Sequence, residues 1–432
     1  MQQMNFLDQI YTDTAFQDNK ELPFHRWVNW IAGFSELFVA EALERHLPNR
    51  RSDITVLDPF SGIGTTMVTA YLRGYSSIGY EINPFPAFVT KAKYQAIHDL
   101  DLDEMNDIIN NFLIHMTNAR MAPISRPPHG FKTRIEFYSP KVLKKVLYAW
   151  DFFETIRDIP VLFDLFRIAF GAVMVSFSNY SYEPSLGSRP ASGKPLIDDF
   201  DVTGSLAAKL KEIYQDILWA RRVAINNSEF RIINQSFFSS DLEAESIDLL
   251  ITSPPYLNNY HYIRNTRPQL FWLGFAQSSS DLHYLETNNY GKYWQTVRDK
   301  RYICSLNIYS SKLQKLIDKI RSVESDRSVY GGHGWANYAC EYFNDTVRFL
   351  QKAADVLKPK SKAVIVIGNS VLKGVEVPTD KVFAYIAQEL GFKNIKIIKV
   401  RDSRIGSSIV GSGARAAGKQ VLYESVVEIE KR

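Results

Sequence analysis

The sequence predicts an α/β fold built on a mostly parallel β-sheet with an antiparallel edge, into which a largely helical insertion is set. The chain has 432 residues and 45% hydrophobic content, enough to fill a large core. Short β-branched runs alternate with helical patterns near both ends of the chain, which is typical of a parallel sheet. The predicted units are an α/β domain of residues 1–100 and 230–432, a helical insertion at 101–229, and a second insertion at 257–335.

Two strand–helix units open the α/β domain, and a glycine-containing turn joins the first strand to its helix. Apolar residues at helical spacing precede them, and Gly74 provides a stop for the helix after the turn. The expected elements are a helix over 34–47, a strand at 54–57, a helix at 67–73, a strand at 77–80 and a helix at 84–96.

The α/β pattern resumes after the helical insertion. The expected elements are a strand at 247–252, a helix at 340–357, a strand at 363–367, a helix at 379–390 and strands at 395–400 and 421–429. Because no helical pattern separates the last two strands, we expect them to form an antiparallel pair at the edge of the sheet. Residues 180–201 are expected to be a loop.

Composition excludes several classes of protein. The longest uncharged apolar run, 168–177, is about half of the ~20 residues that cross a bilayer. The N-terminus carries Asp8 and has no basic stretch before an apolar one, so it is not a secretory signal, and we expect a cytoplasmic protein without a membrane partner. Two distant cysteines, Cys304 and Cys340, build neither a disulfide framework nor a zinc site, so no metal is expected.

The first candidate site is the turn after strand 54–57. Ligands of an open parallel sheet sit beyond the carboxyl ends of its strands, where Gly62 and Gly64 let a ligand approach the backbone. Glu81 follows the next strand, where a carboxylate can accept both hydroxyls of a ribose. The pair predicts an adenosine-containing ligand, and the alternative is a tight turn without a ligand. Met67 interrupts the glycine pattern of dinucleotide-binding proteins, which disfavours that class.

The second candidate site is Ser253-Pro254-Pro255-Tyr256, directly after strand 247–252. Two prolines remove backbone donors and stiffen the turn, so the Ser253 hydroxyl and nearby carbonyls become fixed acceptors. Tyr256 adds a flat aromatic face. Such a turn suits an exocyclic amino group on a planar base, and the alternative is a rigid turn that merely ends a strand.

These two motifs resemble those of the DNA amino-methyltransferases, which use S-adenosylmethionine to methylate N4 of cytosine or N6 of adenine. Asp58-Pro59-Phe60-Ser61-Gly62-Ile63-Gly64-Thr65-Thr66 is similar to their cofactor motif and Ser253-Pro254-Pro255-Tyr256 to their catalytic motif. Phe34-Ser35 resembles an additional cofactor-binding segment. The likeness covers residues 23–100 and 230–432 and implies a Rossmann-like class I methyltransferase fold, with the α/β domain as the catalytic, cofactor-binding domain.

The resemblance also implies roles for individual residues. S-adenosylmethionine would contact Phe34, Ser35, Asp58, Pro59, Phe60, Gly62, Gly64, Thr65, Thr66, Glu81, Ile82 and Asn83, and the catalytic residues would be Ser253, Pro254, Pro255 and Tyr256. Serine at the first position of the four-residue motif usually accompanies cytosine N4 methylation in this family. Where the family often carries an acid after the third strand, this chain offers Gln235, so the contact to the adenine ring is in doubt.

Double-stranded DNA is the expected partner, with a cognate restriction endonuclease in a restriction-modification system. Candidate DNA contacts are Arg189, Arg264, Arg298 and Arg301, within or beside basic or loop-like parts of the insertions. The net charge of +4 permits a polyanionic partner without demanding one. The alternatives are an N6-adenine enzyme, a methyltransferase of transfer-RNA guanine N2, which Ser253 speaks against, and an inactive scaffold that has kept the fold.

Overall fold

The computed structural model describes residues 11, 14–30, 33–47, 49, 51–118, 121–182, 185–224, 228–258, 260–299, 302–324, 332–402 and 422–432. No helix in these ranges is long and apolar enough to cross a membrane.

A seven-stranded sheet forms the centre of the molecule, with the strand order β10-β11-β7-β6-β1-β2-β5. Its strands are β1 Thr55–Asp58, β2 Ser76–Tyr80, β5 Phe230–Ile233, β6 Ile247–Thr252, β7 Leu357–Gly368, β10 Lys393–Asp402 and β11 Tyr423–Glu430. β1 pairs in parallel with β2 on one side and with β6 on the other. The order along the chain therefore reverses at β1, which is where doubly wound sheets bind ligands. The predicted Rossmann-like class I fold is confirmed.

The predicted antiparallel edge is confirmed, because the last two strands, β10 and β11, pair antiparallel at one side of the sheet. β11 also pairs antiparallel with β7, so it lies between β7 and β10, which the sequence did not predict. β10 alone forms this edge. β11 takes an interior place because it is apolar on both of its faces. Val426 and Val427 are buried on opposite sides of the strand and belong to two different core clusters.

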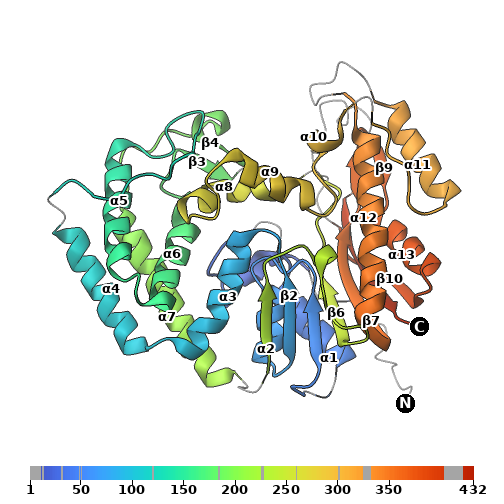
Figure 1. The fold of residues 1–432 in the computed structure, drawn as a ribbon, viewed down its shortest axis with the longest axis horizontal. Helices are drawn as coiled ribbons and strands as arrows, with labels where there is room; N and C mark the ends of the chain where they lie inside the picture. The colour runs from blue at the N-terminus through green and yellow to red at the C-terminus, as the bar shows by residue number, and fades with distance from the viewer. Residues whose placement is uncertain are drawn as a thin grey trace, which may run out of the picture.

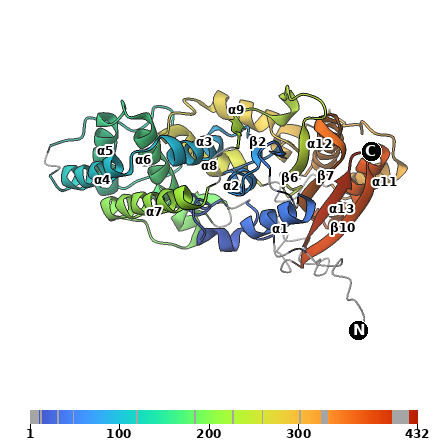
Figure 2. The same ribbon diagram turned by 90° about the horizontal axis from the view of Figure 1, so that it is seen from below.

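Helices cover both faces of the sheet, and strand alternation explains why (Figures 1 and 2). Val56 and Val364 pack with α1 on one face, while Leu57 and Ile365 pack with α12 and α13 on the other. The helices of the α/β domain are α1 Glu36–His46, α2 Thr65–Leu72, α3 Pro84–Asp99, α12 Trp335–Val356 and α13 Thr379–Glu389. The expected helix at 340–357 thus begins five residues earlier, at Trp335, and ends where β7 starts.

The predicted helical insertion consists of α4 Leu102–Thr117, α5 Pro140–Thr155, α6 Pro160–Val173 and α7 Val202–Val223. The expected loop at 180–201 contains a short hairpin, β3 Tyr180–Tyr182 with β4 Leu186–Ser188. Other short elements were not predicted. They are the hairpin of β8 Ser370–Leu372 with β9 Val375–Val377, and the short 3₁₀ helices η2 Phe16–Lys20, η3 Arg189–Ser192 and η4 Phe237–Ser239. The insertion shares one apolar cluster with α3, so it packs directly on the α/β domain.

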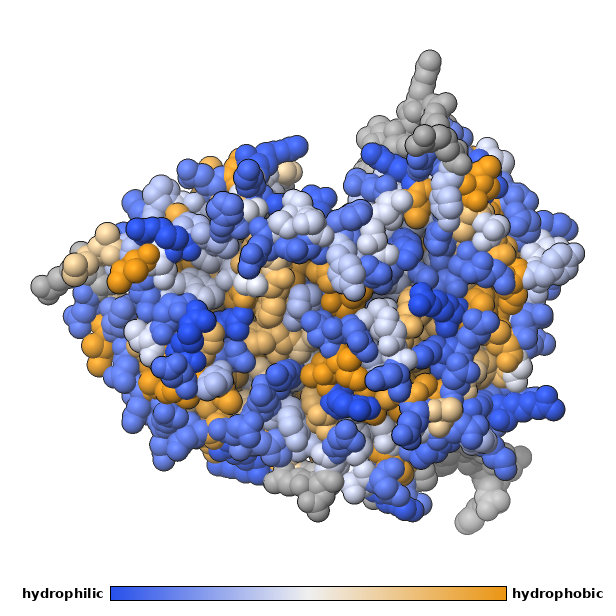
Figure 3. Space-filling view, viewed as in Figure 1, coloured by the Kyte–Doolittle hydropathy of each residue, from blue (hydrophilic) through white to orange (hydrophobic). Residues whose placement is uncertain are grey.

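The second insertion divides between two sides of the molecule. Its elements are α8 Tyr262–Trp272, α9 Ser279–Asn288, α10 Trp294–Val297 and α11 Ser311–Ser322. α8 packs in the core of the helical lobe, whereas α10 and α11 pack with α12. Figure 3 shows the surface hollowed between these two sides, above the carboxyl ends of the parallel strands.

Candidate active site

The turn after β1 has a conformation that requires glycine at two positions. Gly62 and Gly64 have φ of 51° and 82°, in the left-handed region that glycine adopts without strain. A Cβ on Gly64 would lie 2.6 Å from Thr90 Cγ2, and one on Gly62 would lie 3.1 Å from Trp30 Nε1. Side chains at either position would therefore distort the turn and fill the space beside it.

The turn is held from the side of α3. Thr90 Oγ1 donates a hydrogen bond to the Gly62 carbonyl at 3.1 Å, and Lys93 Nζ donates to the Ile63 carbonyl at 2.7 Å. Lys93 is fully buried, and this burial lowers the pKa of its ammonium group to about 7. While α3 donates hydrogen bonds to these carbonyls, the amide N–H of Gly62 points toward the end of β2.

Glu81, directly after β2, accepts a hydrogen bond from that amide. Its Oε2 accepts from Gly62 N–H at 2.9 Å, and its Oε1 accepts from Asn83 N–H at 2.8 Å. Burial raises the pKa of Glu81 to about 7, although these amide hydrogen bonds oppose the shift. Each carboxylate oxygen keeps further acceptor capacity, so both are oriented to take hydroxyl donors from a ligand.

Asp58 connects the two strand ends on which the site depends. Its Oδ1 accepts from the Thr252 hydroxyl at 2.6 Å and from Phe60 N–H at 3.1 Å, while Oδ2 has no hydrogen-bond partner within the described structure. Asp58 is fully buried, and burial raises its pKa to about 6. Asp58 thus ties the end of β1 to the residue that precedes Ser253.

The turn after β6 is fixed by neighbouring elements. Tyr342 on α12 donates from its hydroxyl to the Pro255 carbonyl at 2.9 Å. Tyr256 lies against Gly368, where an added Cβ would meet its ring at 3.0 Å, and its hydroxyl donates to Glu424 Oε1 at 3.3 Å. Burial raises the pKa of Tyr256 well above its usual value, and the Glu424 carboxylate adds to the shift. Tyr256 therefore remains a phenol and is anchored to β11.

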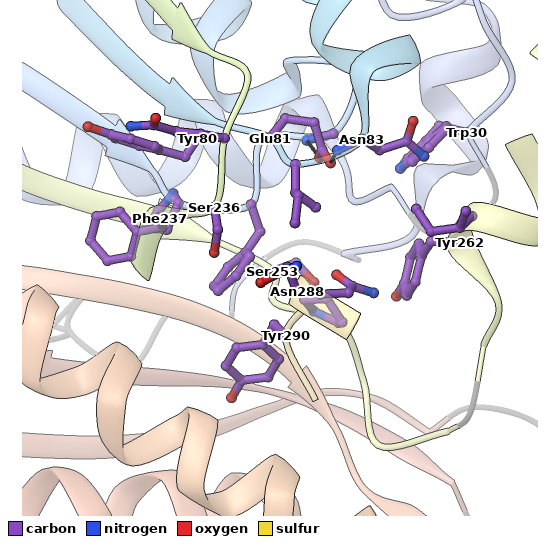
Figure 4. Close-up of a pocket in the computed structure, with 18 residues that line it drawn as sticks. Trp30, Tyr80, Glu81, Asn83, Ser236, Phe237, Ser253, Tyr262, Asn288 and Tyr290 are labelled. Carbon is purple, nitrogen blue, oxygen red and sulfur yellow. Dashed lines mark hydrogen bonds between the residues drawn. The ribbon is translucent and has the colours of Figure 1, made fainter. Parts of the chain in front are cut away.

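Both turns line one cavity of about 640 Å³. The β1 turn contributes Pro59, Phe60 and Gly62, and the β6 turn contributes Ser253 and Pro255. Figure 4 shows Ser253 and Asn288 in the middle of this cavity, with Tyr80 and Phe237 toward one end and Trp30, Asn83 and Tyr262 toward the other.

The structure brings together only part of the set predicted from the sequence. Of the predicted cofactor and catalytic residues, the cavity is lined by Pro59, Phe60, Gly62, Glu81, Ile82, Asn83, Ser253 and Pro255. The others lie outside its lining: Asp58, Gly64, Thr65, Thr66 and Pro254 are buried, Tyr256 is beside β11, and Phe34 and Ser35 are buried next to α1. Phe34 packs on Phe38 in the apolar cluster of that helix, which takes it away from the cavity.

The cavity also contains residues that were not predicted. Trp30 lies against Gly62. Ser236 and Phe237 follow β5, next to Gln235. The remaining unpredicted residues are Tyr262 and Ile263 at the start of α8, Asn288 at the end of α9, and Asn289 and Tyr290 just after it. The aromatic run Tyr260, His261, Tyr262 just beyond the proline turn is a signal in the sequence that could have been used. Nothing local marks Trp30 or Asn288, because they reach the cavity only through tertiary packing.

The arginines predicted to contact DNA are placed as follows. Arg264 is exposed on α8, and Arg298 is exposed just after α10, with its guanidinium 5.2 Å from the Trp294 ring centroid. Arg189 Nε donates to the Pro195 carbonyl at 2.8 Å. Arg301 lies outside the described residues. Within the described ranges, no group of three or more His, Cys, Asp or Glu side chains is arranged to hold a metal.

The fold and the paired turns define a Rossmann-like site at a topological switch point, and comparison with known proteins identifies what it resembles. No family model matches the chain. The chain is similar to Type II methyltransferase M.BsoBI of Geobacillus stearothermophilus, with 24% identity over 96% of this chain and 87% of that one. It is 22% identical to Type II methyltransferase M.AvaI of a Nostoc species over 95% and 87% of the two chains.

A third relative, Type II methyltransferase M.MvaI of Kocuria varians, is 24% identical over 75% of this chain and 72% of its own. The resemblance to methyltransferases that the two motifs predict is thereby confirmed along nearly the whole chain. A solved geranyl diphosphate methyltransferase with GPP and sinefungin aligns with 98% of this chain and 88% of its own, at 8% identity and a TM-score of only 0.31. The assignment of the fold rests instead on the strand order.

Proposed function

We propose that this protein is a DNA methyltransferase that transfers a methyl group from S-adenosylmethionine to N4 of cytosine, as the modification enzyme of a restriction-modification system. The observation that carries the proposal is the single cavity that holds the Gly62–Glu81 arrangement and the Ser253–Pro255 turn together. The similarity to Type II methyltransferases along nearly the whole chain supports the same reaction class.

The residues of the cavity fit S-adenosylmethionine. Glu81 offers two oriented carboxylate oxygens to the ribose hydroxyls, beside a glycine backbone that lets the ligand come close. Phe237, toward one end of the cavity (Figure 4), offers an aromatic face suited to the adenine ring. When bound there, S-adenosylmethionine supplies a methyl group on a positively charged sulfur.

The Ser253 turn acts on the amino nitrogen of the base, which is the atom that receives the methyl group. The Ser253 hydroxyl accepts one hydrogen of the amino group, which helps to turn the nitrogen lone pair out of conjugation with the ring and toward the methyl carbon. The new nitrogen–carbon bond forms as the carbon–sulfur electron pair returns to sulfur, and the amino nitrogen releases one proton to solvent. The chain contributes position and electrostatics, and no covalent enzyme adduct forms.

Cytosine is the proposed base because Ser253 occupies the first position of the catalytic motif, where the resembling family carries serine for cytosine N4. Adenine N6 is the second candidate, because both bases present an amino group beside a ring nitrogen. Either base must leave the helix to reach the cavity, at a cost of a few kcal/mol.

Duplex DNA is proposed to lie in the hollow between α8–α9 and α10–α11 (Figure 3). Arg264 on α8 and Arg298 just after α10 are both exposed. Such arginines attract phosphates without reading sequence.

The test of this function is transfer of labelled methyl groups to duplex DNA, to transfer RNA and to a sample without nucleic acid, followed by identification of the modified nucleoside. We expect N4-methylcytosine in duplex DNA alone. N6-methyladenine would replace the base assignment, methylated transfer-RNA guanine would replace the substrate, and no transfer to any of them would refute the function.

Variants of the catalytic turn extend the test. Ser253→Ala and Tyr256→Ala should each cripple methyl transfer while affinity for S-adenosylmethionine, measured by calorimetry without DNA, stays largely intact. Ser246→Ala, at a half-buried position just before β6, is the matched control. Full activity of either turn variant would contradict its proposed role.

A further inference from the structure

A second cavity adjoins the one described above and shares two of its walls, Trp30 and Tyr262. It is open to solvent and has about 370 Å³ of empty space. Half of its lining residues are aromatic: Trp30, Phe85, Tyr182, Tyr260 and Tyr262. None of the described residues that line it is charged. Flat rings on several sides suit a planar, uncharged ligand better than one that carries formal charges.

Two amide side chains of α8, Asn265 and Gln269, face this cavity. They are one helical turn apart, so they lie on the same face of α8. Both residues are more than nine-tenths buried, at 4% and 5% exposed. Each has one amide atom without a hydrogen-bond partner within the described structure, namely Asn265 Nδ2 and Gln269 Oε1. Unpaired polar atoms at such depth are costly, which points to a ligand that pairs with them.

The orientation of both amides follows from their other contacts. Asn265 Oδ1 accepts from the backbone N–H of Leu186 at 2.8 Å, so the opposite atom is the donor nitrogen. Gln269 Nε2 donates to the Gly171 carbonyl at 3.1 Å and to the Tyr182 hydroxyl at 3.3 Å, so its unpaired atom is the acceptor oxygen. The cavity therefore presents one donor and one acceptor, neither of which can exchange roles by an amide flip.

We propose that this second cavity receives the target base extruded from DNA, and that Asn265 and Gln269 bind the polar edge of that base. The proposal rests on the proposed function. Gln269 accepts the amino hydrogen that Ser253 does not take, and Asn265 donates to the neighbouring ring nitrogen. Tyr260 and Tyr262 provide aromatic surface for the ring. The shared wall at Trp30 and Tyr262 places the base next to the cavity that holds the methyl donor.

The main competing occupant is the amino-acid end of S-adenosylmethionine, which also carries donors and acceptors. Its ammonium and carboxylate groups are both charged, and burial of charges without charged partners is strongly unfavourable. A cavity lined by rings and neutral amides is a poor match for it. A neutral base pairs with the two amides without that cost.

Asn265→Asp is the sharpest variant, because the new side chain keeps an oxygen for the Leu186 N–H and changes only the unpaired donor. Asn110→Asp, exposed on α4, is the matched control for the same chemical change. Two quantities are measured for each protein: kcat/KM for duplex DNA, and the Kd of S-adenosylmethionine without DNA. Thermal unfolding with the cofactor present checks that each variant is folded.

We expect Asn265→Asp to lower kcat/KM for DNA by about tenfold or more while the Kd of the cofactor changes less than about twofold. Tyr260→Ala, at a partly exposed wall of the same cavity, should show the same pattern and serves where the aspartate variant does not fold. A large rise in the cofactor Kd in these variants would assign the cavity to the amino-acid end of the cofactor and overturn the proposal.

Unchanged kinetics with DNA in both variants would also overturn it. These failures are distinct from failure of the proposed function, which shows as absence of methyl transfer to DNA by the wild-type protein.

Discussion

Glu81 and Asp58 show how burial assigns different tasks to two carboxyl groups at neighbouring strand ends. Desolvation raises the pKa of both, to about 7 for Glu81 and about 6 for Asp58. Glu81 borders the cavity, where its oxygens can meet a ligand, whereas Asp58 is enclosed and holds Thr252. The first therefore concerns binding, and the second concerns the position of the Ser253 turn.

The raised pKa of Glu81 predicts pH-dependent binding of S-adenosylmethionine. The ionised carboxylate is the better acceptor for ribose hydroxyls, so the affinity of the wild-type protein should rise between pH 6 and pH 8 as Glu81 loses its proton near pH 7. The effect on stability has the opposite sign. Because the folded pKa lies above the ordinary glutamate pKa of 4.5, the contribution of Glu81 to the free energy of unfolding is full below that pH and is lost as the pH rises through about 7.

Glu81→Gln tests this assignment. At pH 8 we expect the Kd of S-adenosylmethionine to rise about tenfold, since a charge-assisted acceptor is lost, and the affinity to become nearly flat between pH 6 and pH 8. Calorimetric titration measures both. Glu243→Gln, an exposed change before β6, should behave as the wild type. An unaltered pH profile in Glu81→Gln would show that another group titrates.

At the scale of elements, helices act as supports for turns whose residues do the chemistry. Side chains of α3 donate hydrogen bonds to two carbonyls of the turn after β1, and Tyr342 of α12 donates one to the Pro255 carbonyl. These contacts join residues far apart in the chain, and they leave the opposite sides of both turns facing the cavity.

Tyr342→Phe removes the hydrogen bond to Pro255 and leaves the ring in place. A neutral hydrogen bond contributes about 0.5–1.5 kcal/mol, so kcat for methyl transfer should fall by up to about tenfold through a less constrained turn. The Kd of S-adenosylmethionine should not change. Steady-state kinetics on DNA together with calorimetry measures the two effects, and Tyr385→Phe on α13 is the control. Loss of cofactor affinity instead of kcat would contradict the supporting role.

Asp216 on α7 performs a similar task for the segment that carries Trp30. Its carboxylate accepts from Phe24 N–H at 2.8 Å, from Trp27 Nε1 at 3.1 Å and from the Arg26 guanidinium at 2.6 Å. The side chain is 1% exposed, so these donors depend on it for their hydrogen bonds. The helical lobe thereby fixes the N-terminal segment that covers Gly62.

Asp216→Ala should lower the free energy of unfolding by about 3 kcal/mol or more, because it leaves buried donors and an arginine without their partner. Chemical denaturation measures the change. Asp158→Ala, at an exposed position between α5 and α6, should stay within about 0.5 kcal/mol of the wild type. A similarly small effect of Asp216→Ala would mean that the N-terminal segment is held elsewhere.

At the scale of the whole molecule, two lobes stand on either side of the strand ends (Figure 1). Because the second insertion contributes α8 to one lobe and α10 to the other, a single segment of chain builds both sides of the hollow. Exposed arginines occur on both sides, which suits a duplex that spans the gap.

Affinity for DNA should therefore fall steeply with added salt. In a plot of log association constant against log salt concentration, each contacted phosphate should add about −0.9 to the slope. Arg264→Ala and Arg298→Ala should each reduce that slope by about one. Arg51→Ala is the control, because Arg51 lies before β1 at the opposite end of the sheet and pairs with Asp53. Fluorescence anisotropy over a salt series measures the slopes. A flat salt response of the wild type would exclude phosphate-led binding in the hollow.

The sequence by itself determined the parallel core of the sheet and the chemistry of the two turns. β-branched runs, glycines and prolines restrict the backbone over a few residues, so they can be interpreted before any packing is known. Glu81 and Ser253 were predicted in this way, and both line the cavity.

Tertiary structure alone decided which distant residues meet those turns. The place of β11 between β7 and β10, the cover of Gly62 by Trp30 and the buried amides Asn265 and Gln269 depend on contacts between segments far apart in the chain. No local pattern encodes such contacts, because they follow from how apolar surfaces of whole elements fit together.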